Sequence, residues 1–319
     1  MKYKILLTGK NGQVGAELAA LLPSLGEVIA FDRYQLDLSK PDQIRRAIRN
    51  TRPHVIVNAA AYTLVDQAES EERQARVINA DAPAIMAEEA KRIGASLVHY
   101  STDYIFDGSK KLPYDENDPP NPINVYGKTK LAGEQAIQDA GPPYLIFRTA
   151  WVYGTRGRNF LLTILRLATD REELRIVRDQ FGAPTWSREI AKGTARILAQ
   201  LSGQGPEAFL RSSGIYHMTA MGETNWFEFG KAILEEASRT SQGVSWFAAA
   251  TGGHPLVASL VTPVTTEEYP TLARRPANSV LSNSRLKRTF DSELPQWRTQ
   301  LRLAFAESQV KDQSMDPQQ

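Results

Sequence analysis

The chain has 319 residues, no cysteine and a net charge of +2, from 38 Lys and Arg against 36 Asp and Glu. This balance gives no reason to expect nucleic acid or a charged membrane as a partner, and the absence of cysteine excludes disulfides and cysteine-bound zinc. No apolar run reaches the roughly 20 residues of a membrane helix and no signal peptide precedes the first strand, so we expect a soluble cytoplasmic protein.

Short apolar runs alternate with amphipathic stretches over the first half of the chain. The apolar runs, expected to be strands, are Lys4–Thr8, Glu27–Phe31, Val55–Asn58, Ser96–Ser101 and Tyr144–Arg148. The stretches expected to be helices are Val14–Leu22, Pro41–Arg49, Arg76–Ile93 and Gly127–Gln138. Fully buried strands that alternate with helices form a parallel sheet covered on both faces. Residues 1–150 are therefore predicted to form an α/β domain with a doubly wound Rossmann sheet.

The alternation loosens after residue 150. The elements expected there are helices at Ser187–Leu201 and Thr224–Ser238, a strand at Gly214–Thr219, and loops at Gly203–Arg211 and Gly252–Pro255. We expect residues 151–310 to form a smaller α/β substrate lobe over the carboxyl edge of the sheet, with some segments returning to the first domain. Residues 311–319 are polar and are expected to be a disordered tail.

The segment LLTGKNGQVG places Gly9, Gly12 and Gly15 three residues apart, directly after the first expected strand. Glycines in this position permit a tight turn and let a diphosphate approach the amides of a helix N-terminus. A plain structural turn is the alternative. The position of the loop between a strand and a helix favours a dinucleotide site.

Asp32 ends the second strand, twenty residues after Gly12, and Arg33 follows it. The carboxylate could accept hydrogen bonds from an adenosine ribose, which favours NADH, whereas Arg33 could pair with a 2′-phosphate, which favours NADPH. We expect either cofactor, with a slight preference for NADPH; the alternative is a merely polar strand end. Asp37 could contact the adenine or cap the helix that begins near Pro41.

The segment YGKTK places Tyr126 and Lys130 on one face of a helix. A phenol can give a proton to a carbonyl, and a neighbouring ammonium lowers the pKa of the phenol. The fourth strand ends in HYSTDYIFDG, where Thr102 could bind the substrate carbonyl or the phenol and Asp103 could bind a sugar hydroxyl. Each motif is weak alone, but all lie at the carboxyl edge of one sheet.

Taken together, the motifs T-G-x-x-G-x-x-G, N-A-A-A, S-T-D-Y-x-F-D-G, Y-G-x-T-K and R-T-x-W-V-Y resemble the extended short-chain dehydrogenase/reductase superfamily. Within it, the chain is most similar to the dTDP-4-dehydrorhamnose reductase family, and the likeness adds DQFGAPT at Asp179–Thr185 and ARRPANS at Ala273–Ser279. The resemblance implies that the C4 ketone of dTDP-4-dehydro-L-rhamnose is reduced to dTDP-L-rhamnose by hydride from NADPH or NADH, in dTDP-L-rhamnose biosynthesis.

The resemblance also implies roles for individual residues. Tyr126 would donate the proton. Lys130 would lower the pKa of Tyr126 and hold the nicotinamide ribose, and Thr102 would also adjust the pKa of the tyrosine. The remaining cofactor residues would be Gly9, Gly12, Gln13 and Val14 at the diphosphate, Asp32 and Arg33 at the ribose, Asp37 and Leu38 near the adenine, and Ala61, Tyr62 and Thr63 at the middle. Thr102, Asp103 and Trp151 would bind the sugar nucleotide, although Trp151 could instead belong to the core.

Some dimeric members of the family bridge their subunits with Mg²⁺ held by glutamates, and Glu17, Glu189 and Glu307 fall at matching places. The alternative for these three is a solvated helix surface. A homodimer is therefore expected only through the resemblance. The four histidines are scattered, without the spacing of metal ligands, and are interpreted as structural.

Two other functions are compatible with this sequence. The first is another nucleotide-sugar reductase or epimerase on the same scaffold; a dehydratase is disfavoured, because Asp103 is followed by Tyr104 and not by a glutamate. The second is a non-catalytic regulatory subunit of a methionine adenosyltransferase. Such a subunit could lose parts of the Tyr, Lys and Thr set, which is complete here.

Overall fold

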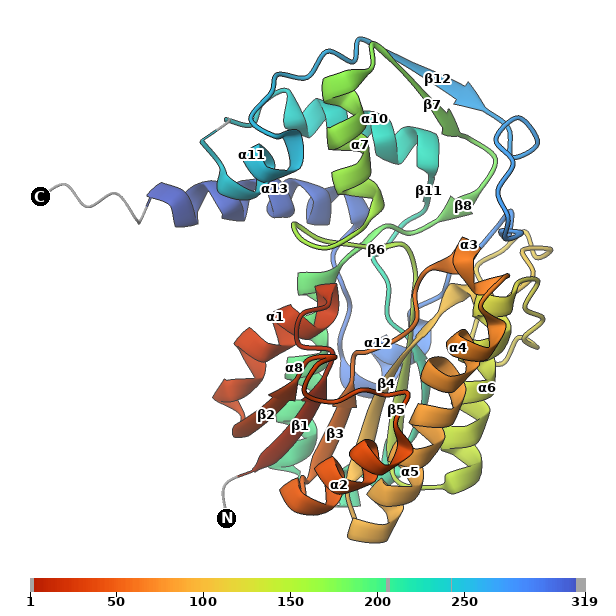
Figure 1. Cartoon of the computed structure of the whole chain (residues 1–319), viewed down its shortest axis with the longest axis vertical. Coiled ribbons are helices and arrows are strands. Elements are labelled where there is room, and N and C mark those ends of the chain that lie inside the picture. The colour runs from red at the N-terminus through yellow and green to blue at the C-terminus, as the bar shows by residue number, and fades with distance from the viewer. Residues whose placement is uncertain (1–2, 205–206, 242, 314–319) are drawn as a thin grey trace, which may run out of the picture.

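The computed structural model describes residues 3–204, 207–241 and 243–313, with side chains described up to residue 306. Its centre is a sheet of six parallel strands in the order β10-β5-β4-β3-β1-β2 (Figure 1). The strands are β1 (Lys4–Thr8), β2 (Glu27–Phe31), β3 (Val55–Asn58), β4 (Ser96–Thr102), β5 (Tyr144–Thr149) and β10 (Gly214–His217). The predicted doubly wound Rossmann sheet is confirmed, and the first three strands have the predicted bounds.

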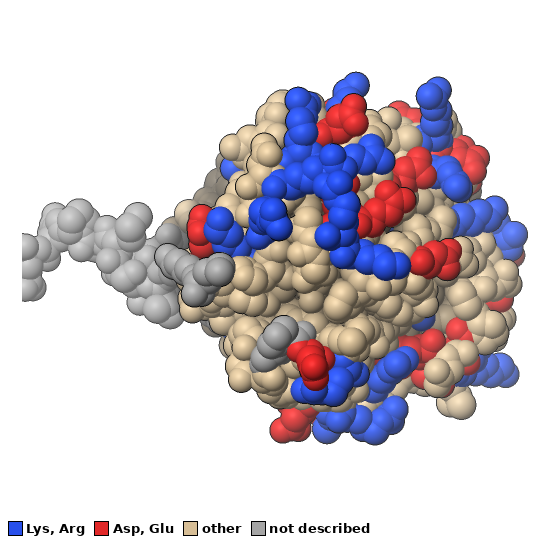
Figure 2. Space-filling model, turned by 90° about the horizontal axis from the view of Figure 1, so that it is seen from below, with Lys and Arg blue, Asp and Glu red and all other residues tan. Residues whose placement is uncertain are grey.

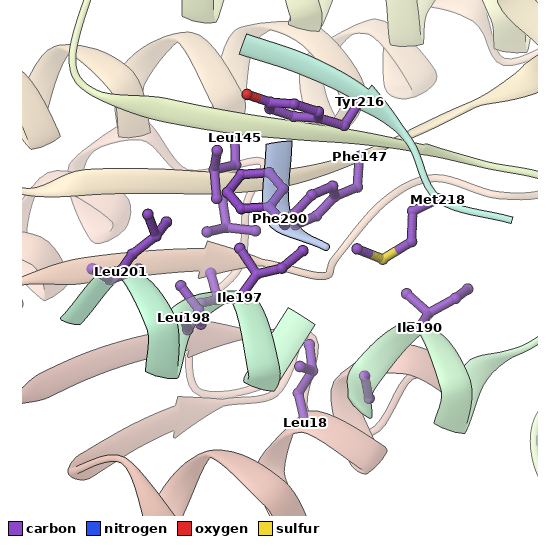
Figure 3. Close-up of a cluster of buried hydrophobic side chains, with 14 of the residues drawn as sticks. Leu18, Leu145, Phe147, Ile190, Ile197, Leu198, Leu201, Tyr216, Met218 and Phe290 are labelled. Atoms are coloured by element: carbon purple, nitrogen blue, oxygen red, sulfur yellow. The ribbon is translucent and has the colours of Figure 1, made fainter. Parts of the chain in front are cut away.

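Helices cover both faces of this sheet because the side chains of a strand alternate between the faces. Leu7 of β1 lies in one core with Leu18 of α1 (Gln13–Leu21) and Ile197 of α8 (Ser187–Gly203). Figure 3 shows this core, in which α1 and α8 face Phe147 of β5. Leu6 points the other way, into a core formed with α2 (Pro41–Thr51), α5 (Ala82–Ile93) and α6 (Val125–Ala140).

The helix predicted at Arg76–Ile93 is interrupted. A π-helical turn, Val77–Asp81, separates α4 (Glu72–Arg76) from α5. A side chain at Gly133 of α6 would place its Cβ 2.1 Å from the carbonyl oxygen of Asn79 in this turn, so glycine lets α6 pack directly on it. The spacing of apolar residues did not predict this turn. A π-helical turn contains one residue more than an α-helical turn, and this changes the spacing of the apolar residues in a long helix only slightly.

A second layer lies above the carboxyl ends of the strands (Figure 1). It contains α7 (Phe160–Asp170), β7 (Glu173–Val177), α10 (Trp226–Ala237), α11 (Ser245–Thr251), β12 (Leu260–Val264) and α13 (Trp297–Gln313). Strand β12 pairs in parallel with β7, and the core of this lobe contains Leu161, Phe229, Ile233 and Leu301. The expected strand at 214–219 lies in the main sheet, where β10 pairs with β5, and α8 and α12 (Ser284–Phe290) also pack on that sheet.

Shorter elements join the two layers. They are α3 (Val65–Ala68), β6 (Val152–Tyr153), β8 (Phe181–Gly182), β9 (Thr185–Trp186), α9 (Glu207–Arg211), β11 (Thr224–Asn225) and the 3₁₀ turns Leu22–Ser24 and Asp103–Ile105. The prediction of a loop over Gly203–Arg211 was wrong for its second half, where α9 forms. This helix forms because Phe209 is buried in the core beside α8. The tail was expected from residue 311, but α13 runs to Gln313, and residues 314–319 lie outside the described residues. Within the described ranges no helix is both long and apolar enough to cross a membrane.

Candidate active site

The glycine loop lies against the end of β3. Gly9 has a left-handed φ of +74°, and a Cβ there would lie 2.9 Å from the backbone nitrogen of Ala60. A Cβ at Gly15 would lie 2.0 Å from the carbonyl oxygen of Gly9, so α1 can begin here only without a side chain. Gly12 is the N-cap of α1, and no side chain caps that helix. The amides of the first turn are thus available to an anion, which fits the diphosphate of a dinucleotide.

The loop also lies at the position where ligands bind in folds of this type. Strand β1 has β2 on one side and β3 on the other, so the order in which strands are added to the sheet reverses at β1. The carboxyl ends of neighbouring strands on the two sides of such a reversal form a crevice. Apart from the glutamates considered for Mg²⁺, the expected site residues end or follow a strand at this edge or lie on α6 beside it.

Asp32 is held by the turn that follows β2. Its Oδ1 accepts hydrogen bonds from the backbone N–H groups of Tyr34 and Gln35, each at 3.0 Å, and its Oδ2 lies 3.4 Å from Nζ of Lys10. The backbone N–H of Gln35 contributes most to lowering the pKa of Asp32, and Lys10 acts in the same direction. Lys10, which lies inside the glycine loop, was not predicted as a site residue. Together with exposed Arg33 it provides a second cation at the expected ribose position.

Asp37 and Leu38 are held by their own neighbours. Oδ1 of Asp37 accepts hydrogen bonds from the backbone N–H and the hydroxyl of Ser39, at 2.9 and 2.7 Å. The N-cap of α2 is Lys40, and no side chain caps this helix, so the alternative in which Asp37 caps it was wrong. Leu38 is buried in the core beside α2 and α5.

The segment after β3, which contains Ala61, Tyr62 and Thr63, is fixed by the π-helical turn. Asn79 in that turn accepts a hydrogen bond from the backbone N–H of Tyr62 at 2.9 Å and donates one to its carbonyl at 3.0 Å. The phenol of Tyr62 donates to Glu71 at 2.8 Å. Ala61 and Tyr62 are half-buried and Thr63 is exposed, so part of this segment is accessible to a ligand, next to Ala60, which lies against Gly9 of the glycine loop.

Tyr126, Thr102 and Asp103 form the centre of the candidate site. Burial raises the pKa of Tyr126 to about 12, whereas its hydrogen bond with Thr102 acts in the opposite direction. The hydroxyl of Thr102 donates to Oδ1 of Asp103 at 3.0 Å and accepts from the N–H of Tyr104 at 3.1 Å. A Cβ at Gly127 would lie 2.1 Å from the carbonyl oxygen of Tyr104, so this glycine brings α6 close to β4.

Asp103 differs from an ordinary surface carboxylate. It is 2% exposed, and its buried Oδ2 has no hydrogen-bond partner among the described residues. Burial raises its pKa to about 7, and the nearby hydroxyls of Ser279 and Thr102 offset this only in part. An unpartnered oxygen in this position can accept a hydrogen bond from a ligand hydroxyl.

Lys130 lies one turn after Tyr126 and ends a row of four buried polar side chains, here named the polar row: Thr8, Asn58, His99 and Lys130. The hydroxyl of Thr8 donates to Oδ1 of Asn58 at 2.7 Å, and Nδ2 of Asn58 lies 3.0 Å from Nδ1 of His99. Nε2 of His99 lies 3.1 Å from Nζ of Lys130, which also donates to the carbonyl of Tyr100 at 2.6 Å. Burial lowers the pKa of Lys130 to about 8.

Trp151 has a left-handed φ of 46°, which is strained for a bulky side chain. Its ring is held from two sides, by Trp226 and by the backbone of Gly182. A Cβ at Gly182 would lie 2.4 Å from Cε2 of Trp151. Neither partner was predicted, because no local sequence pattern connects Trp226 or Gly182 with Trp151.

A hydrogen bond joins the glycine loop to the upper layer. Nδ2 of Asn159 donates to Oε1 of Gln13 at 2.8 Å and to the carbonyl of Gly154 at 2.9 Å. Oδ1 of Asn159 accepts from the N–H of Leu162 and caps α7. Gln13 and Val14 are half-buried. One amide therefore connects the expected diphosphate position with the start of the second layer.

The glutamates considered for Mg²⁺ are engaged with cations of the chain. Oε2 of Glu17 lies 2.9 Å from Arg188, and Oε1 of Glu189 lies 2.8 Å from Lys192. The side chain of Glu307 lies outside the described residues. No group of three or more His, Asp or Glu side chains suited to a metal occurs in the described part of the chain. Within the described part of one chain these glutamates therefore form no metal site by themselves, and a Mg²⁺ site shared between two subunits stays a prediction.

A hollow lined by Arg49, Arg52, Arg92 and Ile93 lies at the opposite edge of the sheet, where α2 and α5 end. Figure 2 shows that Lys and Arg gather on the face seen from below, with Asp and Glu among them. Arg49 and Arg92 both bind Glu89, at 2.6 and 3.0 Å. Basic groups at helix C-termini also interact favourably with the helix dipole, so this cluster has a structural explanation.

The fold and the site define a class of protein: a dinucleotide-binding α/β protein with the tyrosine and lysine arrangement of the extended short-chain dehydrogenases/reductases. The family model described as RmlD substrate binding domain matches residues 3–310. The chain belongs to this family, the dTDP-4-dehydrorhamnose reductases.

Named relatives and one solved structure are similar over almost the whole chain. A dTDP-4-dehydrorhamnose reductase of Burkholderia thailandensis is 51% identical, with 92% of this chain and 95% of the relative covered. The protein of that name from Escherichia coli K12 is 43% identical, with 92% and 94% covered. A structure of dTDP-4-dehydrorhamnose reductase from Bacillus anthracis in complex with NADP is 36% identical and has a TM-score of 0.84, with 96% and 100% covered.

Proposed function

We propose that the chain is an NAD(P)H-dependent dTDP-4-dehydrorhamnose reductase, which reduces the C4 ketone of dTDP-4-dehydro-L-rhamnose to give dTDP-L-rhamnose. Family membership over residues 3–310 supports this reaction. The observation that carries it is the meeting of Tyr126 with Thr102 at the carboxyl edge of the sheet that also holds the glycine loop. The reaction uses a dinucleotide and a sugar nucleotide of the cell interior, so a cytoplasmic location belongs to the proposal.

The proposed cofactor site fits the residues that are present. The amide end of α1 and the Gly9 turn would hold the diphosphate, and Asp32 with Lys10 and Arg33 would face the adenosine ribose. When bound, NADPH or NADH supplies the hydride. The pair of cations beside Asp32 supports the acceptance of both cofactors, because Asp32 can bind a ribose hydroxyl and the cations can bind a phosphate.

The chain's own groups supply the proton and the binding of the sugar. The phenol of Tyr126 gives its proton to the oxygen that forms at C4. The hydroxyl of Thr102 donates to Asp103 in the structure, and it stabilises the phenolate when it turns to donate to Tyr126 instead. Asp103 offers an unpartnered oxygen to a sugar hydroxyl, and Trp151 presents an aromatic face fixed by its partners. Lys130 holds the ribose and stabilises the phenolate when it is charged.

The alternative functions receive less support. None of the three similar proteins above is named as an epimerase or as a regulatory subunit. The Tyr126, Lys130 and Thr102 set is complete, and its members lie around one strand end. A non-catalytic subunit has no need for such a set.

The decisive experiment mixes the purified protein with dTDP-4-dehydrorhamnose made in situ and follows the oxidation of NADPH and NADH separately. We expect consumption of either cofactor, and a loss of about 10²- to 10⁴-fold in kcat for Tyr126→Phe. Tyr144→Phe, at the amino end of β5 and so at the opposite edge of the sheet, is the matched control and keeps its rate. No consumption of either cofactor would refute the assignment, and an undiminished rate for Tyr126→Phe would remove the tyrosine from its role.

A homodimer bridged by Mg²⁺ stays a separate proposal that depends on the resemblance alone. Sedimentation of the protein with MgCl₂ and with EDTA tests it. A dimer that dissociates on chelation supports it, whereas a mass that does not change with Mg²⁺ contradicts the bridge.

A further inference from the structure

The polar row has a direction, which is set by a backbone group. The N–H of Ala60 lies 3.3 Å from Oδ1 of Asn58, and a backbone N–H can only donate. Oδ1 of Asn58 therefore faces Ala60 and the hydroxyl of Thr8, and Nδ2 faces His99. Since Nδ2 carries only donors, Nδ1 of His99 has to accept this hydrogen bond.

This direction places the imidazole proton on the other nitrogen. A neutral imidazole carries one N–H, so acceptance at Nδ1 leaves the proton on Nε2, which points at Nζ of Lys130. Burial lowers the pKa of His99 well below its ordinary value, so the ring is neutral whatever the charge of Lys130. Nζ of Lys130 must then accept from Nε2–H. Only the uncharged amine has a lone pair for this bond, and it still donates to the carbonyl of Tyr100.

Few charged groups near Lys130 oppose the neutral amine as acceptor of the His99 proton. Glu134, one turn further along α6, favours the ammonium. Its carboxylate is already matched by Arg148 of β5, whose Nη2 lies 2.7 Å from it in a buried pair. Asp103, beyond β4, acts on Tyr126. Within the described residues, His99 is the titratable group that contacts Nζ of Lys130 directly.

We propose that Asn58 and His99 are positioning residues that control the protonation of Lys130: they shift its equilibrium toward the neutral amine in the free protein. The ammonium, which would stabilise the phenolate of Tyr126, then forms only when the imidazole proton moves to Nδ1 or the Asn58 amide turns over. Because the charged lysine is the productive form, this inference makes His99 a determinant of the alkaline limb of activity. Its kinetic consequence rests on the proposed function, whereas the position of the imidazole proton does not.

The first test is a nuclear magnetic resonance spectrum of the wild-type protein labelled with ¹⁵N-histidine. The chain has four histidines, and loss of one imidazole signal in His99→Gln assigns the ring. We expect the proton of His99 on Nε2, with Nδ1 unprotonated. A proton found on Nδ1 at neutral pH overturns the proposal. This result requires no substrate, so it is independent of a failure of the reductase assignment.

The second test reverses the direction of the row with Asn58→Asp. The new carboxylate can only accept, so His99 would donate from Nδ1 and Nε2 would become free to accept from an ammonium. We expect the alkaline limb of kcat/KM to move up by about one pH unit or more, as for a group that gains a nearby opposite charge. A ¹⁵N-lysine titration of Lys130 should move by the same amount. Asn50→Asp, which adds the same charge at an exposed position on α2, controls for charge alone and should leave the limb in place.

Equal pH profiles for Asn58→Asp, Asn50→Asp and the wild type would overturn the proposal that Asn58 and His99 control the protonation of Lys130. A uniform loss of activity in Asn58→Asp with an unmoved alkaline limb would show a merely structural role and would also overturn it. If Asn58→Asp does not fold, the tautomer in the wild-type spectrum decides.

Discussion

The rings of Trp151 and Trp226 lie flat on one another, with centroids 3.5 Å apart and planes inclined by 5°. Trp151 follows β5 of the main sheet, and Trp226 begins α10 of the upper layer. The stack therefore joins the two layers directly above the candidate site. A tryptophan with a strained backbone is held in place by a residue 75 positions further along the chain.

Trp226→Leu should weaken the binding of the sugar nucleotide more than it slows the reaction. Without its partner the ring of Trp151 can rotate, and aromatic pairs contribute about 0.5–1.5 kcal/mol beyond burial. We expect the KM of the sugar substrate to rise up to about tenfold with a smaller change in kcat. Trp226→Phe retains an aromatic face and should recover most of the affinity. An unchanged KM in Trp226→Leu would show that the Trp151–Trp226 stack does not contribute to substrate binding.

Gly182→Ala should destabilise the protein and disturb Trp151. Because a Cβ at this position would lie within 2.4 Å of the indole, ring or backbone must move, and overpacking of this kind costs about 1–3 kcal/mol. Thermal unfolding measures the loss. Gly203→Ala is the matched control, since a Cβ there meets no atom within 4 Å, and its stability should not fall.

Lys10→Met should shift the cofactor preference toward NADH. Lys10 balances the charge of Asp32, so its removal leaves the carboxylate to repel a 2′-phosphate. We expect the ratio of the dissociation constants for NADPH and NADH to change about tenfold, which corresponds to about 1.4 kcal/mol. Fluorescence titration of each cofactor provides the measurement without turnover. Lys91→Met, at an exposed position near the end of α5, should leave the ratio unchanged.

Asp103→Asn should become relatively more stable as the pH rises. Burial raises the pKa of Asp103 in the folded protein to about 7, above the value of an unfolded aspartate, so the native protein binds a proton that the unfolded chain does not. The wild type therefore loses stability as the pH rises through about 7, whereas the asparagine variant does not titrate at this position. Between pH 5 and pH 8 we expect the variant to gain about 1–3 kcal/mol relative to the wild type in urea unfolding. A difference that does not vary with pH would exclude a raised pKa.

The sheet could be predicted closely from sequence because the strands buried on both faces are continuous apolar runs. Leu6, for example, has apolar neighbours that point to the opposite face, so no alternation obscures the strand. The π-helical turn and α9 could not be predicted, because their conformation depends on contacts with α6 and with the core beside α8. Local propensity gives no sign of such distant partners.

The candidate site was predictable only as far as its motifs extend. Tyr126, Thr102 and the glycine loop belong to short patterns with a physical rationale, and the structure places them at one edge of the sheet. Trp226 lies in no motif, and only the fold brings it against Trp151. His99 was interpreted as structural because its partners, Asn58 and Lys130, are 41 and 31 residues away in the chain. A lone histidine in a strand carries no spacing that could have indicated this contact.

The wide turn at Val77–Asp81 also sets the rotational phase of the helix that follows it. An α-helix advances by about 100° per residue, so deletion of one residue in this turn would rotate all of α5 by that angle about its axis. Ile85 and Met86, which are buried against the sheet, would rotate toward solvent. Asn79 would lose its two hydrogen bonds to the backbone of Tyr62. The number of residues in this turn is therefore as strictly constrained as the identity of the side chains around it.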